Sequence, residues 1–481
     1  MTEFDADHGR WSAVQQLAAL DRREFSAREL LDETRERYER INPAINAVVA
    51  VDFEAAEAAA SESDRRRDAG DAARPLEGLP VVVKDLEDTA GLRTTYGSML
   101  HADHVPERDS LIVERLRAAG AVIYGKSNTP EFGTGSHTYN RVYGTTTNPY
   151  DPGRSAGGSS GGAAAALAAG LSSVADGSDM GGSLRNPAAF CNVVGLRPTI
   201  GRVPDRPVPD SWDTIATCGP MGRTVADVAL LLSVLSGGDP RCPIAFPEST
   251  SPAVPELRGP LRVGWSRTLG GLDIDAGITE VLDGVGLPSL LGLGHAVADV
   301  EPEFEEADAA FRTLRAFGYA RSFSSDLERH RERLGAELIA NTEAGLRLTV
   351  EDLRRATLQR ERVFARMTEL FERIDVLAAP VTTALPFSAD ISWPREVCGV
   401  DQPDYLEWMR ASTRISITGF TALSVPCGFT PDGLPVGLQL VAPPREEGRI
   451  LALAAQLERL NPFWRRTPAV LEHPRYQCKG A

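Results

Sequence analysis

The sequence predicts an α/β fold in which helices cover both faces of a central sheet. Short apolar runs bounded by Gly and Pro alternate with helical segments along most of the chain, a pattern typical of strands that are buried on both faces. No repeat of fixed period and no low-complexity linker divides the 481 residues. We therefore expect one compact unit, although this length would suffice for about three domains.

The composition is that of an ordinary globular protein. Hydrophobic residues make up 42% of the chain and charged residues 25%, which excludes disordered, collagen-like and coiled-coil classes. The formal net charge of −16 argues against binding to nucleic-acid phosphates as the main activity. The chain has no run of eighteen apolar residues, and its first residues lack the features of a secretion signal. We therefore expect a cytoplasmic protein that binds no membrane and no nucleic acid.

Cysteine and histidine residues are both scattered along the chain. The six Cys form no CxxC pair, so we interpret them as mostly structural thiols. His101 and His104 lie three residues apart, but no neighbouring residue completes a set of metal ligands. The sequence therefore predicts no metal site.

The N-terminal part, about 11–67, has a helical pattern. Ser26 is a plausible N-cap, and Glu29, three residues later, completes a capping box. We expect Asn42-Pro43 to end that helix. The Ala-rich and charge-rich stretch that follows predicts a second, exposed helix that closes at Gly70.

Short apolar runs mark the middle of the chain. They lie at 79–85, 116–126, 193–199 and 261–266. The Ala-rich run 162–175, opened by glycines, predicts a helix whose small side chains allow close packing against a sheet.

The last 200 residues are less regular. Because Pro288 and four Gly interrupt the segment 283–295, any helix there should be short or broken. Pro431-Asp432-Gly433 lies between alternating apolar residues and predicts a hairpin over 421–443. The other predicted elements are helices at 307–334 and 350–374, a strand at 375–380 and a terminal helix at 450–460.

Two clusters of small polar residues stand out, Gly157–Gly162 and Ser178–Ser183. Gly157 to Gly161 fits the G-x-S-x-G nucleophile elbow with Ser159 as nucleophile, but the elbow needs an apolar strand before it and the residues there are polar. The same glycines could form an anion cradle at a helix N-terminus, although the Gly-Lys-Ser/Thr ending of a Walker loop is absent. For one cluster alone, a loop that only lets a helix pack tightly is the favoured interpretation.

Lys84 lies at the end of the apolar run 79–85 and favours a functional role for the two clusters over a role in packing alone. A lone Lys after a strand is more often an outward-pointing residue. Together with both clusters, however, it falls in a series of segments that closely resembles the amidase signature family. These segments are 75–85, 125–135, 143–166, 177–199, 219–232 and 428–441, in this order along nearly the whole chain.

The resemblance implies a fold and its parts. The fold is the amidase signature fold, a single domain over 1–481 with a central mixed, mostly parallel twisted sheet covered by helices on both faces. Its parts are N-terminal helices at about 11–67, a signature core at about 75–240, a variable substrate-pocket region at about 265–420, and a C-terminal hairpin and helix at 421–460.

The resemblance also implies three catalytic residues. Lys84 matches the family's lysine, Ser159 its cis-serine, which follows a cis peptide bond, and Ser183 its nucleophile. A serine hydroxyl needs a base to take its proton, and a lysine serves as base only when it is neutral. Because the ordinary pKa of lysine is near 10.4, burial must disfavour the charged form of Lys84.

Residues around Ser183 receive supporting roles by the same resemblance. We expect the backbone N–H groups of Met180, Gly181, Gly182 and Ser183 itself to stabilise an oxyanion, since glycines let the main chain approach closely. The Met180 side chain, at a position where relatives often carry Thr, Ile or Ala, favours an apolar or aromatic acyl group.

Two charged and two polar neighbours remain. Asp179 and Arg185 are interpreted as residues that hold the loop. Ser160 and Ser178 either form hydrogen bonds within the site or cap turns. The loop 134–137 is expected to line the acyl side of the pocket, with His137 as a wall or surface residue.

The expected activity is hydrolysis of a small non-peptide carboxamide to a carboxylate and ammonia or an amine, without a cofactor. The first alternative is an A-type component of an amidotransferase that works on misacylated tRNA; its acidic residue for the amine of glutamine has no counterpart in the stretch 414–426. A non-catalytic ligand or nucleotide binder is the second, and a homodimer is left open. Candidate pocket walls are Phe317, Tyr319, Phe387, Trp393 and Trp408.

Overall fold

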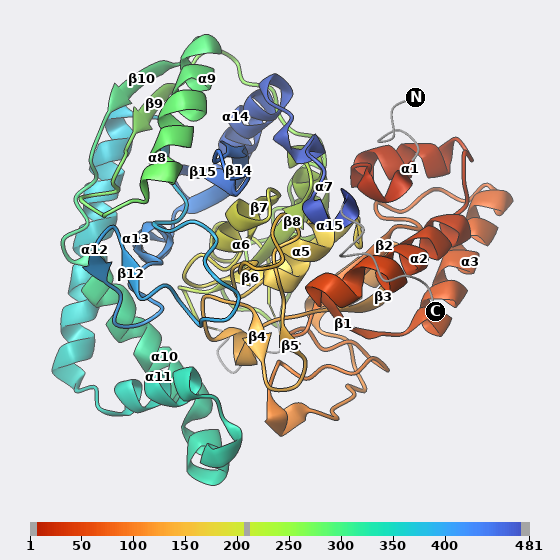
Figure 1. The fold of residues 1–481 in the computed structure, drawn as a ribbon, viewed down its shortest axis with the longest axis horizontal. Helices are drawn as coiled ribbons and strands as arrows, with labels where there is room; N and C mark the ends of the chain where they lie inside the picture. The colour runs from red at the N-terminus through yellow and green to blue at the C-terminus, as the bar shows by residue number, and fades with distance from the viewer. Residues whose placement is uncertain (1–6, 206–211, 473–481) are drawn as a thin grey trace.

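An eleven-stranded sheet runs through the centre of the computed structural model, which describes residues 7–205 and 212–472 (Figure 1). The strand order is β1-β3-β2-β6-β8-β7-β14-β15-β11-β9-β10. The strands are β1 (Val48–Val51), β2 (Pro80–Lys84), β3 (Val122–Ser127), β6 (Val174–Asp179), β7 (Val194–Arg197), β8 (Thr217–Gly222), β9 (Arg262–Trp265), β10 (Ala296–Asp299), β11 (Val376–Pro380), β14 (Thr421–Phe429) and β15 (Pro435–Ala442).

The mixed sheet agrees with the predicted fold class, but fewer of its strand pairs are parallel than predicted. Parallel pairs occur in β3–β2–β6 and in β11–β9–β10. The other six neighbouring pairs are antiparallel, so the sheet is not mostly parallel. The reason lies in the connections, because β14 and β15 are joined by a hairpin and antiparallel neighbours need no crossover helix.

Helices cover both faces of the sheet. Helices α5 (Gly161–Ala168) and α6 (Arg185–Phe190) pack on one face, and α7 (Val225–Leu235) and α14 (Glu447–Leu460) pack on the other. A Cβ on Gly219 of β8 would lie 2.8 Å from Leu184, beside α6, whereas one on Gly222 would lie 2.7 Å from Cβ of Asp227 in α7. These glycines therefore let both helix layers approach the sheet closely.

The remaining elements surround this core. The helices are α1 (Ala13–Asp21), α2 (Ala27–Ile45), α3 (Phe53–Ala69), α4 (Leu111–Ala118), α8 (Ala276–Val281), α9 (Leu287–Gly292), α10 (Ala307–His330), α11 (Ala336–Leu346), α12 (Val350–Arg373), α13 (Arg410–Thr418) and α15 (Ala469–Glu472), with single turns at His8–Arg10, Met99–His101, Glu131–Gly133, Arg331–Arg333 and Phe463–Arg465. Two small sheets pair β4 (Tyr139–Asn140) with β5 (Gly144–Thr145), and β12 (Glu396–Val397) with β13 (Val400–Asp401).

In the N-terminal part, the capping box of Ser26 and Glu29 is present at the start of α2, and α3 ends at Gly70 in the left-handed conformation, as predicted. The predicted end at Asn42-Pro43 is wrong, because α2 continues to Ile45. The helix continues past Pro43 and is capped by Asn46, which has the left-handed conformation and donates its N–H to the carbonyl of Asn42. The predicted helical region is also interrupted by β1, which pairs with β3 at the edge of the sheet.

The Ala-rich helix is confirmed but shorter than predicted. Helix α5 ends at Ala168, near Gly170, which has φ +72°, and the end of the predicted helix becomes β6. In the segment predicted to be broken, a π-helical turn, Leu282–Gly286, joins α8 to α9. The hairpin, both long helices, the strand 376–380 and the terminal helix are confirmed.

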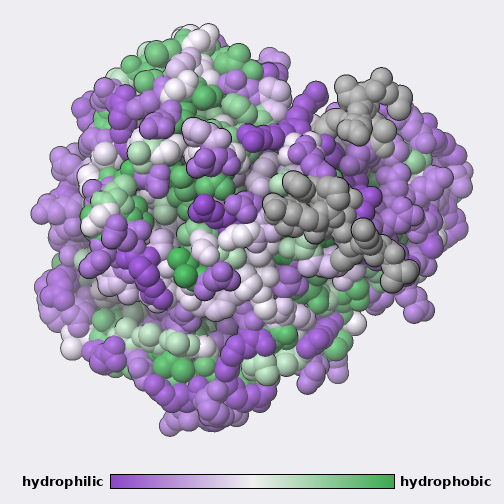
Figure 2. Space-filling view, in the orientation of Figure 1, coloured by the Kyte–Doolittle hydropathy of each residue, from purple (hydrophilic) through white to green (hydrophobic). Residues whose placement is uncertain are grey.

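The surface agrees with the acidic composition. On the face in Figure 2, hydrophilic residues predominate, most densely over the N-terminal helices at the right, and hydrophobic patches are scattered between them. Across the described ranges, no helix combines the length and apolarity needed to cross a bilayer.

The division of the chain into a signature core, a substrate-pocket region and terminal parts stays a prediction.

Candidate active site

The site lies where β2, β6 and the start of α5 meet. Lys84 is the last residue of β2, and Ser178 lies near the end of β6. Because β2 and β6 are parallel neighbours, their carboxyl ends reach the same edge of the sheet, where α/β proteins place their ligands. Ser159 and Ser160 immediately precede α5, which packs against both strands.

Lys84 is surrounded by serine hydroxyls. Its Nζ lies 2.9 Å from the Oγ atoms of Ser159, Ser160 and Ser178, and the side chain is 1% exposed. Burial lowers the pKa of Lys84 to about 8, against the opposing influence of Cys218 and nearby acids. Ser160 and Ser178 therefore form hydrogen bonds within the site, which is the first of the two roles considered for them.

The peptide bond between Gly158 and Ser159 is cis, as the family resemblance implies. A Cβ on Gly158 would lie 2.9 Å from the backbone N of His137, so only glycine fits before this bond. Ser160 occupies the N-cap position of α5 but makes no side-chain capping bond there. Its hydroxyl is instead directed to Lys84.

Asp179 and Arg185 form a buried ion pair that holds the loop after β6. Arg185 donates from Nε and Nη2 to the two carboxylate oxygens, each at 3.0 Å, and both side chains are 0% exposed. Burial would raise the pKa of Asp179, but Arg185 and Arg197 outweigh it and hold that pKa well below its ordinary value. These contacts agree with the predicted loop-holding role.

One predicted oxyanion donor already has a partner. Gly182 donates its N–H to Oδ1 of Asp179 at 2.8 Å, so the prediction for this N–H needs correction. Gly182 has φ +111°, and a Cβ on it would lie 2.5 Å from Cβ of Ser412. Its function in this structure is to let the loop turn, which leaves Met180, Gly181 and Ser183 as the predicted donors.

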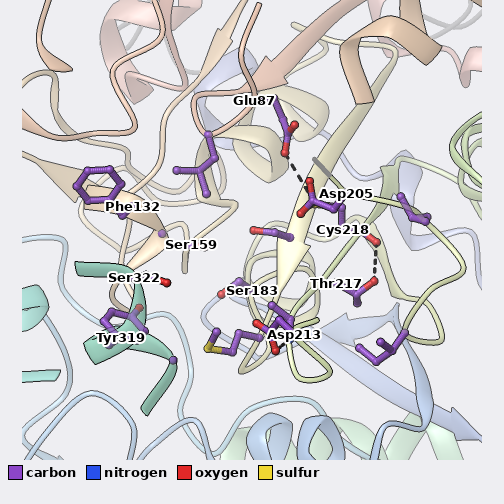
Figure 3. A pocket seen from close by; sticks show the side chains of 18 of the residues that line it. Glu87, Phe132, Ser159, Ser183, Asp205, Asp213, Thr217, Cys218, Tyr319 and Ser322 are labelled. Carbon is purple, nitrogen blue, oxygen red and sulfur yellow. Dashed lines mark hydrogen bonds between the residues drawn. The ribbon is translucent and has the colours of Figure 1, made fainter. Parts of the chain in front are cut away.

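A cavity of about 260 Å³ opens beside these residues. Ser159, Ser183 and Met180 lie on its wall. Figure 3 shows Ser159 and Ser183 between two different ends. One end is mostly aromatic, with Phe132 and Tyr319, and the other end is polar, with Glu87, Asp205, Asp213, Thr217 and Cys218. Phe323 belongs to the aromatic end, because its ring contacts those of Phe132 and Tyr319.

Sequence spacing gave no sign of the polar end. Glu87 is far in sequence from Asp205 and Cys218, yet one ligand atom of each of the three residues lies within 4.8 Å of the others. The Cys218 thiol contacts Asp205 at 3.2 Å, and Ser110 donates to Glu87 at 2.7 Å. Burial raises the pKa of all three groups, which favours their protonated forms and lets them share protons through hydrogen bonds.

Of the five aromatic residues predicted to line the pocket, only Tyr319 lies on the wall of this cavity. Phe387 and Trp408 pack edge to face in the main core, Trp393 lines a second cavity, and Phe317 is 39% exposed.

His137 was expected as a wall or surface residue, which is wrong. It is 1% exposed, its Nδ1 lies 2.6 Å from the Ser155 hydroxyl, and its Nε2 lies 3.1 Å from the carbonyl of Ala389. Burial lowers its pKa to about 4, so it is a neutral residue that packs the loop. The walls that sequence reasoning missed, Phe132 and Phe323, lie beside the expected loop and on α10.

Comparisons with known proteins agree with this geometry. The family described as Amidase matches residues 29–451. An acylamidase of Rhodococcus erythropolis is 35% identical over 95% of this chain and 97% of its own. The A-type component of a glutamyl-tRNA(Gln) amidotransferase of Chloroflexus aurantiacus is 36% identical over 94% of this chain and 97% of its own.

A solved structure shows the same fold. The crystal structure of a bacterial aryl acylamidase of the amidase signature family superposes with a TM-score of 0.87 and 26% identity, covering 94% of this chain and 96% of that one. The chain therefore belongs to the amidase family and is a hydrolase that acts on amide C–N bonds.

Proposed function

We propose that this enzyme hydrolyses a small non-peptide carboxamide through an acyl-enzyme on Ser183, with Lys84 as base and Ser159 as proton relay. One observation carries the proposal: a buried amine lies 2.9 Å from Ser159 Oγ, and Ser159 shares the wall of one cavity with Ser183. A non-catalytic binder would not need a buried lysine with a lowered pKa in such a cavity.

The proton path follows from the hydrogen-bonding capacity of a neutral amine. A neutral lysine has two N–H donors and one lone pair, so one of the three surrounding hydroxyls must donate to it. In the proposed path that hydroxyl is Ser159. It gives its proton to Lys84 as it accepts the proton of Ser183, whose Oγ forms the bond to the amide carbon.

The second half of the reaction reverses this path. The oxyanion of the tetrahedral intermediate accepts hydrogen bonds from the N–H groups of Met180, Gly181 and Ser183. As the C–N bond breaks, Lys84 returns its proton through Ser159 to the leaving nitrogen. Water then attacks the acyl carbon and loses a proton to the relay. The relay gives this proton to Ser183 Oγ as the bond between Oγ and the acyl carbon breaks, and the product leaves as the carboxylate.

The cavity supports an apolar acyl group. Phe132, Tyr319 and Phe323 form one end, and the Met180 side chain also lines the cavity. Aromatic side chains bind planar apolar groups with favourable ring geometry. A volume of about 260 Å³ suits a single-ring amide better than a peptide.

Transamidation is the second candidate, because amidotransferase components of similar identity cover nearly the whole chain. An acidic residue for the amine of glutamine is missing from 414–426, which favours simple hydrolysis. Ammonia release from benzamide and phenylacetamide, compared with release from glutamine, separates the two candidates. Turnover of the aryl amides with a fluorophosphonate adduct on Ser183 supports the proposal, and a folded enzyme that releases ammonia only from glutamine contradicts it.

Ser159→Ala is expected to lower kcat by about 10³-fold with KM nearly unchanged, since removing an acid–base group costs about 10²–10⁴-fold. The cavity wall and the oxyanion loop stay in place, so binding should persist. Steady-state kinetics on phenylacetamide measures both constants.

Ser160→Ala is the matched control, because Ser160 also contacts Lys84 but does not line the cavity. Its loss of kcat should be much smaller. A loss equal to or greater than that of Ser159→Ala would place the relay on Ser160.

A further inference from the structure

We infer that Arg315 is a positioning residue that fixes the aromatic end of the catalytic cavity and so determines preference for aryl-substituted amides. This inference rests on the proposed function. Arg315 lies on α10, 5% exposed, and contacts Tyr319 one turn later. It reaches the substrate only through that ring.

The guanidinium of Arg315 holds the Tyr319 side chain in two ways. Its Nη2 donates to the Tyr319 hydroxyl at 2.9 Å, and its Cζ lies 4.2 Å from the centroid of the same ring. It also donates to the Tyr405 hydroxyl and to the side-chain oxygen of Asn341. All three partners are uncharged, so the cation is held by two hydroxyls, an amide oxygen and ring faces.

Tyr319 also contacts the loop that forms the facing wall of the cavity. Its hydroxyl lies 2.9 Å from Oγ1 of Thr134, which follows Phe132 and Gly133 on the cavity wall. Phe132 has φ +47°, a conformation that bulky residues rarely adopt. Its ring contacts Phe323 of α10, with centroids 5.0 Å apart. One hydroxyl therefore links α10 to the loop that supplies the facing aromatic ring.

The other partners of Arg315 lie behind the wall. Tyr405 and Asn341 line the second cavity, which is separate from the one that holds Ser159 and Ser183. Asn341 also donates to the Tyr405 hydroxyl at 3.0 Å. The network thus anchors Tyr319 to α11 and to the 393–406 segment without touching the reacting groups.

Arg315→Met is expected to raise KM for phenylacetamide about tenfold, whereas KM for acetamide should change less than twofold. The ring of phenylacetamide needs the fixed wall, but acetamide is too short to reach it. Small displacements in a binding wall cost one to two decades. Tyr405→Phe, which removes one acceptor and introduces no charge or cavity, should shift the same ratio in the same direction. Arg315→Lys should restore the ratio of the two KM values only partly, because an ammonium lacks the planar, forked set of N–H donors of a guanidinium.

Arg312→Met is the matched control, since Arg312 lies on α10, pairs with Asp404 and Glu407 and lines only the second cavity. It should leave the phenylacetamide-to-acetamide ratio unchanged. An unchanged ratio in folded Arg315→Met and Tyr405→Phe, or an equal loss on both amides, would overturn the inference. A wild-type enzyme that hydrolyses neither amide would instead overturn the proposed function.

Discussion

Ser183→Ala is expected to abolish amide hydrolysis, with a loss of about 10⁶-fold in kcat. Such losses are typical when the nucleophile of a serine hydrolase is removed. Ser183 is 7% exposed on the wall of the cavity, so the lost hydroxyl leaves only a small gap. The fold should persist, because Asp179 and Arg185, not Ser183, hold the loop.

Ammonia release measures this loss, and the melting temperature shows that the variant is folded. Mass spectrometry after fluorophosphonate treatment should find one adduct on the wild-type enzyme and none on Ser183→Ala. Residual turnover within about a hundredfold of the wild type would exclude Ser183 as nucleophile. An adduct on Ser159 would assign that role to the first glycine-rich cluster.

Lys84→Met is expected to lower kcat by about 10⁴-fold, the upper range for loss of a general base. Methionine is of similar length, so it fills the space of the lysine stem. The variant should fold, since the buried amine is costly to desolvate and a thioether is not. The free energy of unfolding, measured in urea, shows whether the Lys84→Met variant is folded.

Lys126→Met is the matched control for this variant. Lys126 is also fully buried, on the neighbouring strand β3, but its Nζ donates to the carbonyl of Glu87 and to the Thr89 hydroxyl. It contacts none of the three serines. It should lose less than tenfold in kcat, and a loss equal to that of Lys84→Met would show that any buried charge in this region affects turnover.

The sequence predicted the elements that have a strong local pattern. The run Val81–Val83 identified β2, and the small side chains of 163–166 identified the helix that packs on it. Strands β6 and β8 were not predicted, because Gly177, Gly219 and Gly222 replace the apolar residues that mark a strand. These glycines are needed where α6 and α7 approach the sheet, a requirement that only the packed structure reveals.

The site was predictable to the same extent. Lys84, Ser159 and Ser183 were found through a family resemblance, and the structure adds why Ser160 and Ser178 matter, since both contact the amine. The polar end of the cavity was not predicted, because it joins Glu87 to Cys218, which lies 131 residues later in the chain. The partner of the Gly182 N–H depends on loop geometry, which residue type alone does not specify.

The pH dependence of kcat/KM for phenylacetamide tests the role of Lys84 most directly. A base must be neutral, and the pKa of Lys84 is lowered to about 8, so the neutral fraction and the rate should both rise as the pH increases through this value. We expect kcat/KM to rise tenfold per pH unit below about pH 7, with a midpoint near pH 8 and a plateau above it. A profile that is flat from pH 6 to 9, or that is highest near pH 5, would contradict it.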